Sequence, residues 1–188
     1  YMEAYWWHWL YTRDRRFLKN VSYDVIREIA LFFVDFVSRD EHGKYCIFPS
    51  NSPEQGEWWI KDPTIDVALV KELFEGAIET SRVLGRDERL RKKWQHILEN
   101  LSDYPTGGNV YLDYDKAPCD SPLRHPALMA PVFPAGQVGA DGPDDLSALA
   151  RNTFENILER GERKKEGFPL DMPTWNDDMS WPWLACIA

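Results

Sequence analysis

Apolar side chains recur every three or four residues along several stretches of the chain, which is the spacing of one buried face of an α-helix. No stretch shows the sustained alternation of apolar and polar residues that is typical of a half-buried strand. The pattern therefore predicts an all-α fold. The predicted helices cover residues 2–12, 22–38, 65–84, 87–101 and 144–161, and a further helix begins in the closing segment 175–188.

Turn-forming residues predict where these helices begin and end. Gly85 follows the third helix, at a place where a left-handed residue commonly ends a helix, and Asp87 is expected to cap the next one. Asp144 or Asp145 is expected to cap the helix 144–161, and Gly161 to end it.

The connections between the predicted helices alternate between short and long. About two residues join the helices 65–84 and 87–101, whereas the loops 39–64 and 102–144 contain about 26 and about 43 residues, a length that usually serves a function in a compact domain. Helical hairpins with tight turns at one end and long aromatic-rich loops at the other favour a toroid whose loops build a site on one face. An α-solenoid is the structural alternative, but solenoids repeat at a near-constant period that this sequence lacks.

Charge and hydropathy exclude two classes of partner. The chain contains 22 Lys and Arg against 31 Asp and Glu, a net charge of -9, and no basic block long enough to follow a phosphate backbone, so nucleic acid is not expected. The most apolar stretch, 29–37, is about half as long as the roughly 20 residues that cross a bilayer, so no membrane span is expected.

The three cysteines are an odd number without CxxC spacing, which indicates neither a disulfide framework nor a zinc site. We expect Cys46, Cys119 and Cys186 to be small buried apolar residues. No metal and no other cofactor is implied.

Aromatic residues are the unusual part of the composition, with nine Trp, eight Tyr and nine Phe. Flat aromatic faces suit the C–H faces of sugar rings, although large helical cores also bury aromatic side chains. Both uses remain open for any one Trp.

Glu54 is the best candidate for chemistry in the first long loop. Pro53 restricts the chain before it and Gly56 permits an unusual turn after it, so its side chain can be held at one angle. Crowding by the neighbouring indoles would desolvate the carboxyl, raise its pKa and keep it protonated near neutral pH. A general acid that protonates a glycosidic oxygen needs this state. The alternative is that Glu54 caps the following helix or forms a salt bridge with it.

Four segments form a recognisable series: LYTRDRRFLKNVSYDVIREIALFFVDFV, GKYCIFPSNSPEQGEWW, IDVALVKELFEGAIETSRVLG and RHPALMAPVFPAGQVG. In this order, from about Leu10 to Gly139, they resemble the catalytic domain of glycoside hydrolase family 95. The P-S-x-S-P-E pattern is the most specific part. The resemblance implies an (α/α)6 toroid and an inverting α-L-fucosidase or α-L-galactosidase.

The resemblance also implies roles for particular residues. Glu54, the glutamate of the Ser-Pro-Glu motif, is the general acid. Asp66 opens the helix after that loop and is interpreted as an N-terminal cap or a loop anchor. Arg124 and His125 match part of a His-Arg-His-x-Ser-His stretch that lines the sugar pocket, and we expect Trp58 to line the substrate site with them.

Two stretches differ from the family pattern. Leu123 replaces the first histidine of the pocket stretch, and residues 126–128 replace its Ser-His part. Residues 174–178 replace a later Gly-Trp-Ser segment, and in them Asp177 and Asp178 either contact substrate hydroxyls or cap the final helix. The sequence therefore does not name the sugar.

An inverting mechanism needs a second group that activates water on the opposite face of the sugar. The resembled family uses asparagines upstream and an aspartate downstream, and this chain contains neither motif. Because the chain starts at Tyr1 and closes on an apolar run, we expect residues 1–188 to be one partial domain, truncated at both ends and inactive alone. Its partners would be a glycan substrate and the rest of the parent polypeptide.

The hypothesis is thus a glycosidase, which the resemblance implies to be secreted or periplasmic. A non-catalytic carbohydrate-binding or scaffold protein would keep the aromatic loops without the chemistry. An (α/α)6 relative such as a phosphorylase or lyase would use another mechanism. Both alternatives remain open at the level of the sequence.

Overall fold

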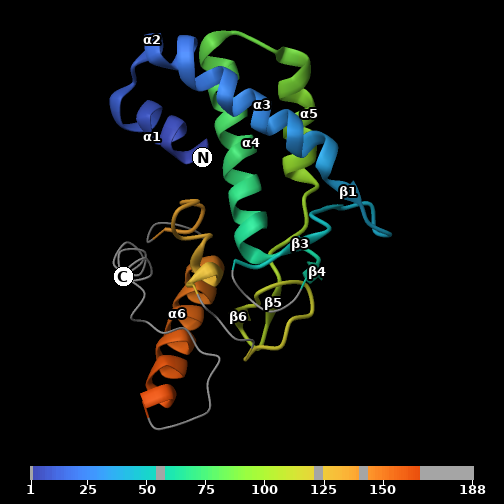
Figure 1. Ribbon diagram of the computed structural model, residues 1–188, viewed down its shortest axis with the longest axis vertical. Coiled ribbons are helices and arrows are strands. Elements are labelled where there is room, and N and C mark those ends of the chain that lie inside the picture. Colours follow the sequence, from blue (N-terminus) through green and yellow to red (C-terminus); the bar gives the residue numbers. More distant parts are fainter. Residues whose placement is uncertain (1, 54–57, 121–124, 140–143, 166–188) are drawn as a thin grey trace. The chain divides into compact units, whose positions relative to one another are not determined.

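The fold is described from a computed structural model, in which the chain divides into two compact units. The first unit comprises Tyr1–Cys46 and Val70–Ser102, and the second comprises Ile47–Leu69 and Asp103–Ala188. The structure describes residues 2–53, 58–120, 125–139 and 144–165 (Figure 1).

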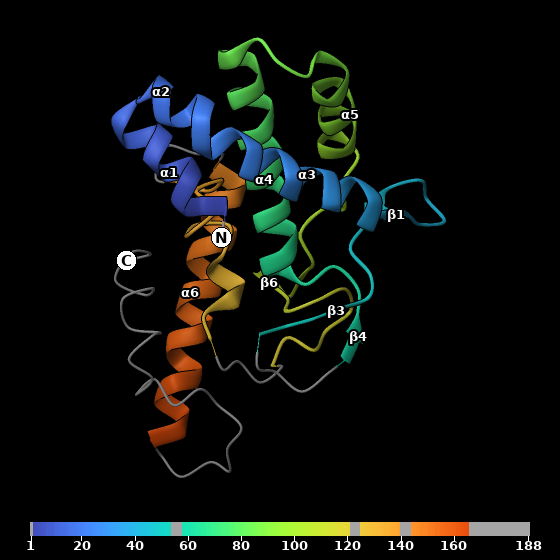
Figure 2. The ribbon, with the colours of Figure 1, turned by 45° about the horizontal axis from the view of Figure 1, so that its top comes forward.

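Helices make up most of the first unit. In both ribbon views α5 runs back alongside α4, and α3 packs against α1 and α5 (Figures 1 and 2). The predicted helices of this unit are confirmed, with ends that differ by about two residues or fewer. The helices are α1 (Met2–Thr12), α2 (Arg15–Phe17), the π-helical turn η1 (Leu18–Ser22), α3 (Tyr23–Phe36), the larger part of α4 (Thr64–Leu84) and α5 (Glu88–Glu99).

A capped turn between α1 and α3 was not predicted from the apolar pattern. Asp14 Oδ1 accepts hydrogen bonds from the backbone N–H groups of Arg16 and Phe17, each at 2.9 Å, and so caps α2. The Asp14 N–H in turn donates to Thr12 Oγ1 at 3.1 Å. Helical structure therefore resumes at Arg15 and not at residue 22.

Large apolar side chains of α3, α4 and α5 form the core of the first unit. Ile26, Phe74 and Trp94 have no exposed surface, and burying such a side chain stabilises the fold by about 1.5–3 kcal/mol. A Cβ at Gly76 of α4 would lie 3.3 Å from the Trp6 ring, so the glycine lets this indole of α1 lie against α4. Trp6 and Trp94 therefore have packing roles.

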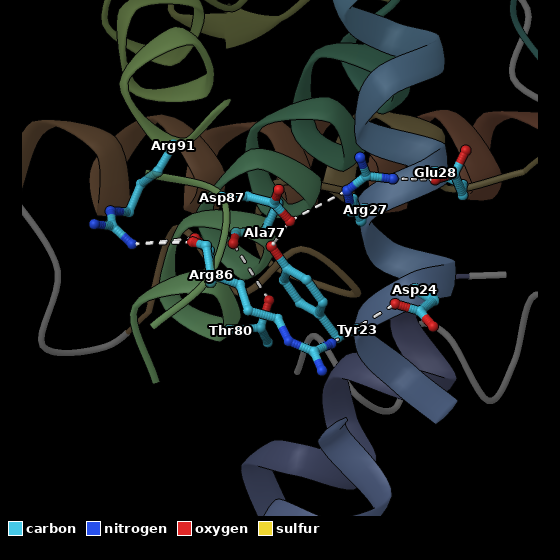
Figure 3. Close-up of polar contacts among 10 residues, drawn as sticks. Tyr23, Asp24, Arg27, Glu28, Ala77, Thr80, Arg86, Asp87 and Arg91 are labelled. Carbon is cyan, nitrogen blue, oxygen red and sulfur yellow. Dashed lines mark hydrogen bonds and ion pairs between the residues drawn. The ribbon is translucent and has the colours of Figure 1, made fainter. Parts of the chain in front are cut away.

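A polar network joins α3 to the turn between α4 and α5 (Figure 3). The Tyr23 hydroxyl donates to Asp87 Oδ2 at 2.7 Å, and Arg27 Nε donates to the same oxygen at 3.2 Å. Burial, reinforced by the hydrogen bond to Asp87, raises the pKa of Tyr23 to about 12. Asp87 occupies the N-cap position of α5 without a side-chain cap bond. The prediction that Asp87 caps this helix is wrong, because residues of α3 bind its carboxylate.

The second unit packs α6 (Asp144–Lys165) against the 3₁₀ turn η2 (Ala127–Met129) and against the hairpin of β5 (Thr106–Gly107) and β6 (Val110–Tyr111). Tyr111, Met129 and Ile157 are each 1% exposed in its core. The Tyr111 N–H donates to Thr153 Oγ1 at 2.9 Å and ties β6 to α6. The prediction that α6 ends at Gly161 is wrong. A glycine inside a helix costs only about 1 kcal/mol relative to Ala, which good helix formers around it offset.

The described part of the chain is mostly helical, which agrees with the predicted all-α class. Its strands form pairs in or beside the two long loops. Each strand has only two or three residues, which is too short to produce an alternation of apolar and polar residues in the sequence. All three pairs are antiparallel. They are β1 (Ser38–Arg39) with β2 (Tyr45–Cys46), β3 (Ser50–Asn51) with β4 (Trp58–Ile60), and β5 (Thr106–Gly107) with β6 (Val110–Tyr111).

The cysteines differ in their surroundings. Cys46 is buried, as predicted, whereas Cys119 is exposed because it lies in the second long loop and not in the core. Cys186 lies outside the described residues, as does the predicted helix in 175–188. Within the described residues, no group of His, Cys, Asp and Glu could hold a metal ion, and no helix is both long and apolar enough to cross a membrane.

Candidate active site

The Ser-Pro-Glu motif lies in the segment that joins strands β3 and β4. Ser50 pairs with Ile60, and Asn51 pairs with Trp58, so the two strands form an antiparallel hairpin. Glu54 belongs to the connecting residues 52–57 and lies outside the described residues. The described side chains therefore show which contacts fix the residues on either side of Glu54 in the sequence.

Asp66 of α4 binds Ser50, the first serine of the P-S-x-S-P-E pattern. The Ser50 hydroxyl donates to Asp66 Oδ2. Asp66 is the third residue of α4, so it is not the N-cap, and its interpretation as a loop anchor is confirmed. Burial raises the pKa of Asp66, and the neighbouring Asp113 and Asp62 raise it further, while the hydrogen bond from Ser50 opposes this change.

Asp113 from the second long loop holds the second serine. The Ser52 hydroxyl donates to Asp113 Oδ1 at 2.6 Å, and the two residues are only 1% and 5% exposed. The same segment also holds the start of α4. Thr64 N–H donates to the Asp113 carbonyl at 2.9 Å, and Thr64 Oγ1 donates to the Leu112 carbonyl at 2.6 Å. A backbone N–H that has no partner within its own helix is thereby satisfied.

Asp62 closes the base of the loop. Its backbone N–H donates to the Ile47 carbonyl at 2.9 Å, and its Oδ1 accepts from the Ile47 N–H at 2.7 Å. The Asp115 N–H donates to the Lys61 carbonyl at 3.0 Å, which adds a second tie to the second long loop. Asp62 is 3% exposed, so these bonds are made away from bulk solvent.

Three carboxyl groups thus fix the chain on both sides of Glu54. Each of Asp62, Asp66 and Asp113 accepts a hydrogen bond from a hydroxyl or an N–H of the loop that runs from 47 to 62. Hydrogen bonds to carboxyl oxygens are among the stronger ones in proteins. The arrangement can hold a reactive side chain of the connecting segment in a set position, which acid–base chemistry requires.

The other predicted site residues lie on separate elements of the second unit. Trp58 is on β4 and is 75% exposed. His125 directly precedes Pro126 and η2 and is half-buried. Arg124 lies outside the described residues, as do Asp177 and Asp178.

Asp113 is the main residue that reasoning from the sequence missed. It follows the apolar run 110–112 inside a long loop, a setting that fits a surface aspartate equally well. No periodicity or local motif in the sequence marks it as the partner of Ser52.

The model of the glycosyl hydrolase family 95 catalytic domain matches residues 1–184. This chain belongs to glycosyl hydrolase family 95. It is similar to alpha-L-fucosidase 2 of Arabidopsis thaliana, with 29% identity over 89 residues, which cover 43% of this chain and 11% of that protein. The chain thus spans about a tenth of the length of this relative. The family resemblance stated from the sequence is confirmed by the family match.

Proposed function

We propose that the complete protein containing this chain hydrolyses α-L-fucosyl-type glycosidic bonds with inversion, and that Glu54 is its general acid. The observation that carries the proposal is the pair of hydrogen bonds from Ser50 and Ser52 to Asp66 and Asp113, which fixes the chain leading into the Ser-Pro-Glu motif. Family membership supports the reaction class, and the name of the A. thaliana relative supports the sugar.

The charge around the loop supports a protonated acid. An extended chain spans at most about 3.6 Å per residue, so the Cα atom of Glu54 is within about 7 Å of that of Ser52. Ser52 is bonded to Asp113, and Asp66 and Asp62 bind the same loop. Carboxylates nearby disfavour a further negative charge and so raise the pKa of a neighbouring carboxyl. A general acid operating near neutral pH needs this shift.

The remaining catalytic and sugar-binding groups are proposed to come partly from this chain and partly from other parts of the polypeptide. Trp58, Arg124 and His125 would contact the sugars. A base about 6.5–9.5 Å from the acid would activate the water, as inversion requires, and we assign it to polypeptide outside the 188 residues. That polypeptide would also complete an (α/α)6 toroid, of which this chain is a partial domain.

The test uses the complete protein with 4-nitrophenyl α-L-fucoside and with a fucosylated oligosaccharide. We expect release of fucose first seen as its β anomer by NMR, because inversion of an α linkage gives a β product. Glu54→Gln should lower kcat about 10²–10⁴-fold, the usual contribution of a general acid, while Glu57→Gln in the same segment serves as the matched control.

Each alternative predicts a different result in the same assays. Undiminished turnover of the fucosylated oligosaccharide by Glu54→Gln would exclude Glu54 as the acid. Turnover that depends on phosphate would identify a phosphorylase, and an unsaturated product would identify a lyase. Binding of the oligosaccharide without any turnover would identify the non-catalytic scaffold.

A further inference from the structure

Trp59 occupies a backbone position that normally favours glycine. Ser50 lies opposite Ile60, and Asn51 lies opposite Trp58, so Trp59 is an extra residue of β4 where the register shifts. Its φ is +67°, in the left-handed region. A bulge with this conformation usually contains glycine, because a side chain with a Cβ is strained there.

Packing within the described part of the chain does not account for tryptophan at this bulge. The side chain of Trp59 is 72% exposed, and that of its neighbour Trp58 is 75% exposed. Neither indole has a ring or cation partner among the described residues. Backbone strain of this kind persists where surrounding structure holds it in place, and it clusters at functional sites. The two indoles therefore form an exposed apolar surface that needs an external partner.

The position of this surface relative to the motif indicates what the partner is. The segment that joins β3 to β4 contains Glu54, four residues before Trp58. An extended chain allows the Cα atoms of these two residues a separation of at most about 14 Å. A sugar whose glycosidic oxygen lies next to the Glu54 carboxyl is therefore within reach of the indoles.

We propose that Trp58 and Trp59 form an aromatic platform that stacks on the pyranose ring on the leaving-group side of the scissile bond. This inference rests on the proposed function. A general acid must reach the glycosidic oxygen, which departs with the leaving sugar, so the hairpin that carries the acid faces that sugar. An indole offers a flat apolar face to the C–H face of a pyranose and keeps its N–H available for a hydroxyl.

The border of the platform favours a sugar over another segment of polypeptide. Asn51, the cross-strand neighbour of Trp58, is exposed. Its amide can donate to and accept from the hydroxyl groups at the edge of a sugar ring. A surface that buries a protein segment would instead continue as apolar side chains around the indoles.

The experiment compares two ligands that differ in the leaving-group sugar. The complete protein is used in its Glu54→Gln form, whose lowered kcat keeps hydrolysis slow during a titration. Its affinities for 2′-fucosyllactose and methyl α-L-fucoside are measured by calorimetry. We expect Trp59→Gly to weaken binding of the trisaccharide about tenfold and to leave binding of the methyl fucoside within about twofold. Trp58→Ala should behave in the same way. Phe48→Ala, a partly exposed aromatic of the same loop, is the matched control and should leave both affinities unchanged.

Thermal unfolding provides the second measurement. Glycine fits a left-handed bulge, so Trp59→Gly should melt at the same temperature as the parent or at a higher one. The expected combination is therefore undiminished stability with lost affinity for the trisaccharide. Trp59→Asn, which also tolerates this conformation, gives a second variant with the same expected result.

Several results would overturn the platform. One is equal affinity for the trisaccharide with and without the Trp59→Gly substitution. Another is that this substitution weakens the binding of both ligands equally. A third is that the Glu54→Gln parent binds neither ligand. Shielding of the two indoles from acrylamide before sugar is added would show that another part of the protein covers them, and would also overturn it.

The hydrolysis of α-L-fucosyl fluoride by the unmodified protein tests the proposed function without testing the platform. The leaving group of this substrate is a single atom, so the substrate does not engage the platform. Absence of fluoride turnover would contradict the proposed function, whereas the platform is judged by the binding difference alone.

Discussion

The hydroxyl of Ser52 donates to Asp113 Oδ1 at 2.6 Å although 61 residues separate the two in the sequence. Both side chains are buried, so neither has bulk water as an alternative partner. Through this bond the second long loop holds the first long loop two residues before Glu54. The strength of the bond is therefore a measure of how firmly the motif is held.

A double-mutant cycle on this pair should show coupling. Ser52→Ala and Asp113→Ala should each cost about 1–3 kcal/mol, because each leaves a buried polar group without its partner. The double variant should be more stable than the sum of the two predicts, by about 1 kcal/mol. The measurement is denaturant unfolding of the complete protein.

The control for that cycle is Ser147→Ala. The Ser147 hydroxyl donates to the Gly139 carbonyl at 3.1 Å in an exposed setting, so its loss should stay within about 0.5 kcal/mol. Strict additivity of Ser52→Ala and Asp113→Ala would contradict a direct interaction.

Glu54→Gln should distinguish substrates by their need for a proton. Its kcat on a fucosylated oligosaccharide should fall about 10²–10⁴-fold, because a poor leaving group needs general acid catalysis. Turnover of α-L-fucosyl fluoride should fall far less, because fluoride departs with little help from a proton. Steady-state rates on the two substrates test this, and an equal loss on both would indicate a structural role for Glu54.

Glu72 should make the stability of the protein depend on pH. It lies on α4 and is 3% exposed. Burial, together with the charges of Glu3 and Glu75, raises its pKa from 4.5 to about 7, while a hydrogen bond from the Trp7 side chain opposes the change. Between these two pH values the folded state binds a proton that the unfolded state has released. Stability should therefore fall as pH rises from 4.5 to 7, by about 3 kcal/mol.

Glu72→Gln should remove this slope and leave the protein more stable than the parent above pH 7. Unfolding free energies measured from pH 4.5 to 8 provide the test. Glu99→Gln, at an exposed position of α5, should keep the slope of the parent. A slope that survives Glu72→Gln would assign the pH dependence to another group.

Tyr23→Phe should destabilise the protein by about 1 kcal/mol. The substitution removes the hydrogen bond to Asp87 and keeps the ring, which is 1% exposed, in the core. The bond from Arg27 to Asp87 limits the cost, because the carboxylate retains one donor. Thermal unfolding measures the effect, and Tyr11→Phe is the control, since Tyr11 is 86% exposed. Equal melting temperatures for all three proteins would mean that the bond contributes no net stability.

The helices could be predicted from the sequence because their signal is local. A buried face repeats within about four residues, so α1, α3, α4 and α5 follow from short windows. The ends were less predictable, since competing contacts decide them. Asp87 has the residue type of a cap but binds Tyr23 and Arg27 from another helix, and Gly161 has the type of a stop but lies within α6.

The site could be predicted only in part, because some of its contacts join residues that are far apart in the sequence. The Ser-Pro-Glu pattern is contiguous and marks Glu54, and Asp66 follows it by 12 residues. Asp113 is brought to Ser52 by the course of a loop that has no periodicity of its own. The bulge at Trp59 likewise depends on the register between two very short strands. Neither relationship leaves a repeated pattern in the sequence.

The anchors of the motif loop determine how it can be transplanted. A peptide of residues 47–62 contains Ser50, Ser52 and the Ile47–Asp62 closure, yet it lacks the carboxyls that the two serines bind. A host protein would also have to supply the first turn of α4 and the segment around Asp113. Designers who wish to move this loop into another scaffold must therefore graft three discontinuous pieces as one unit.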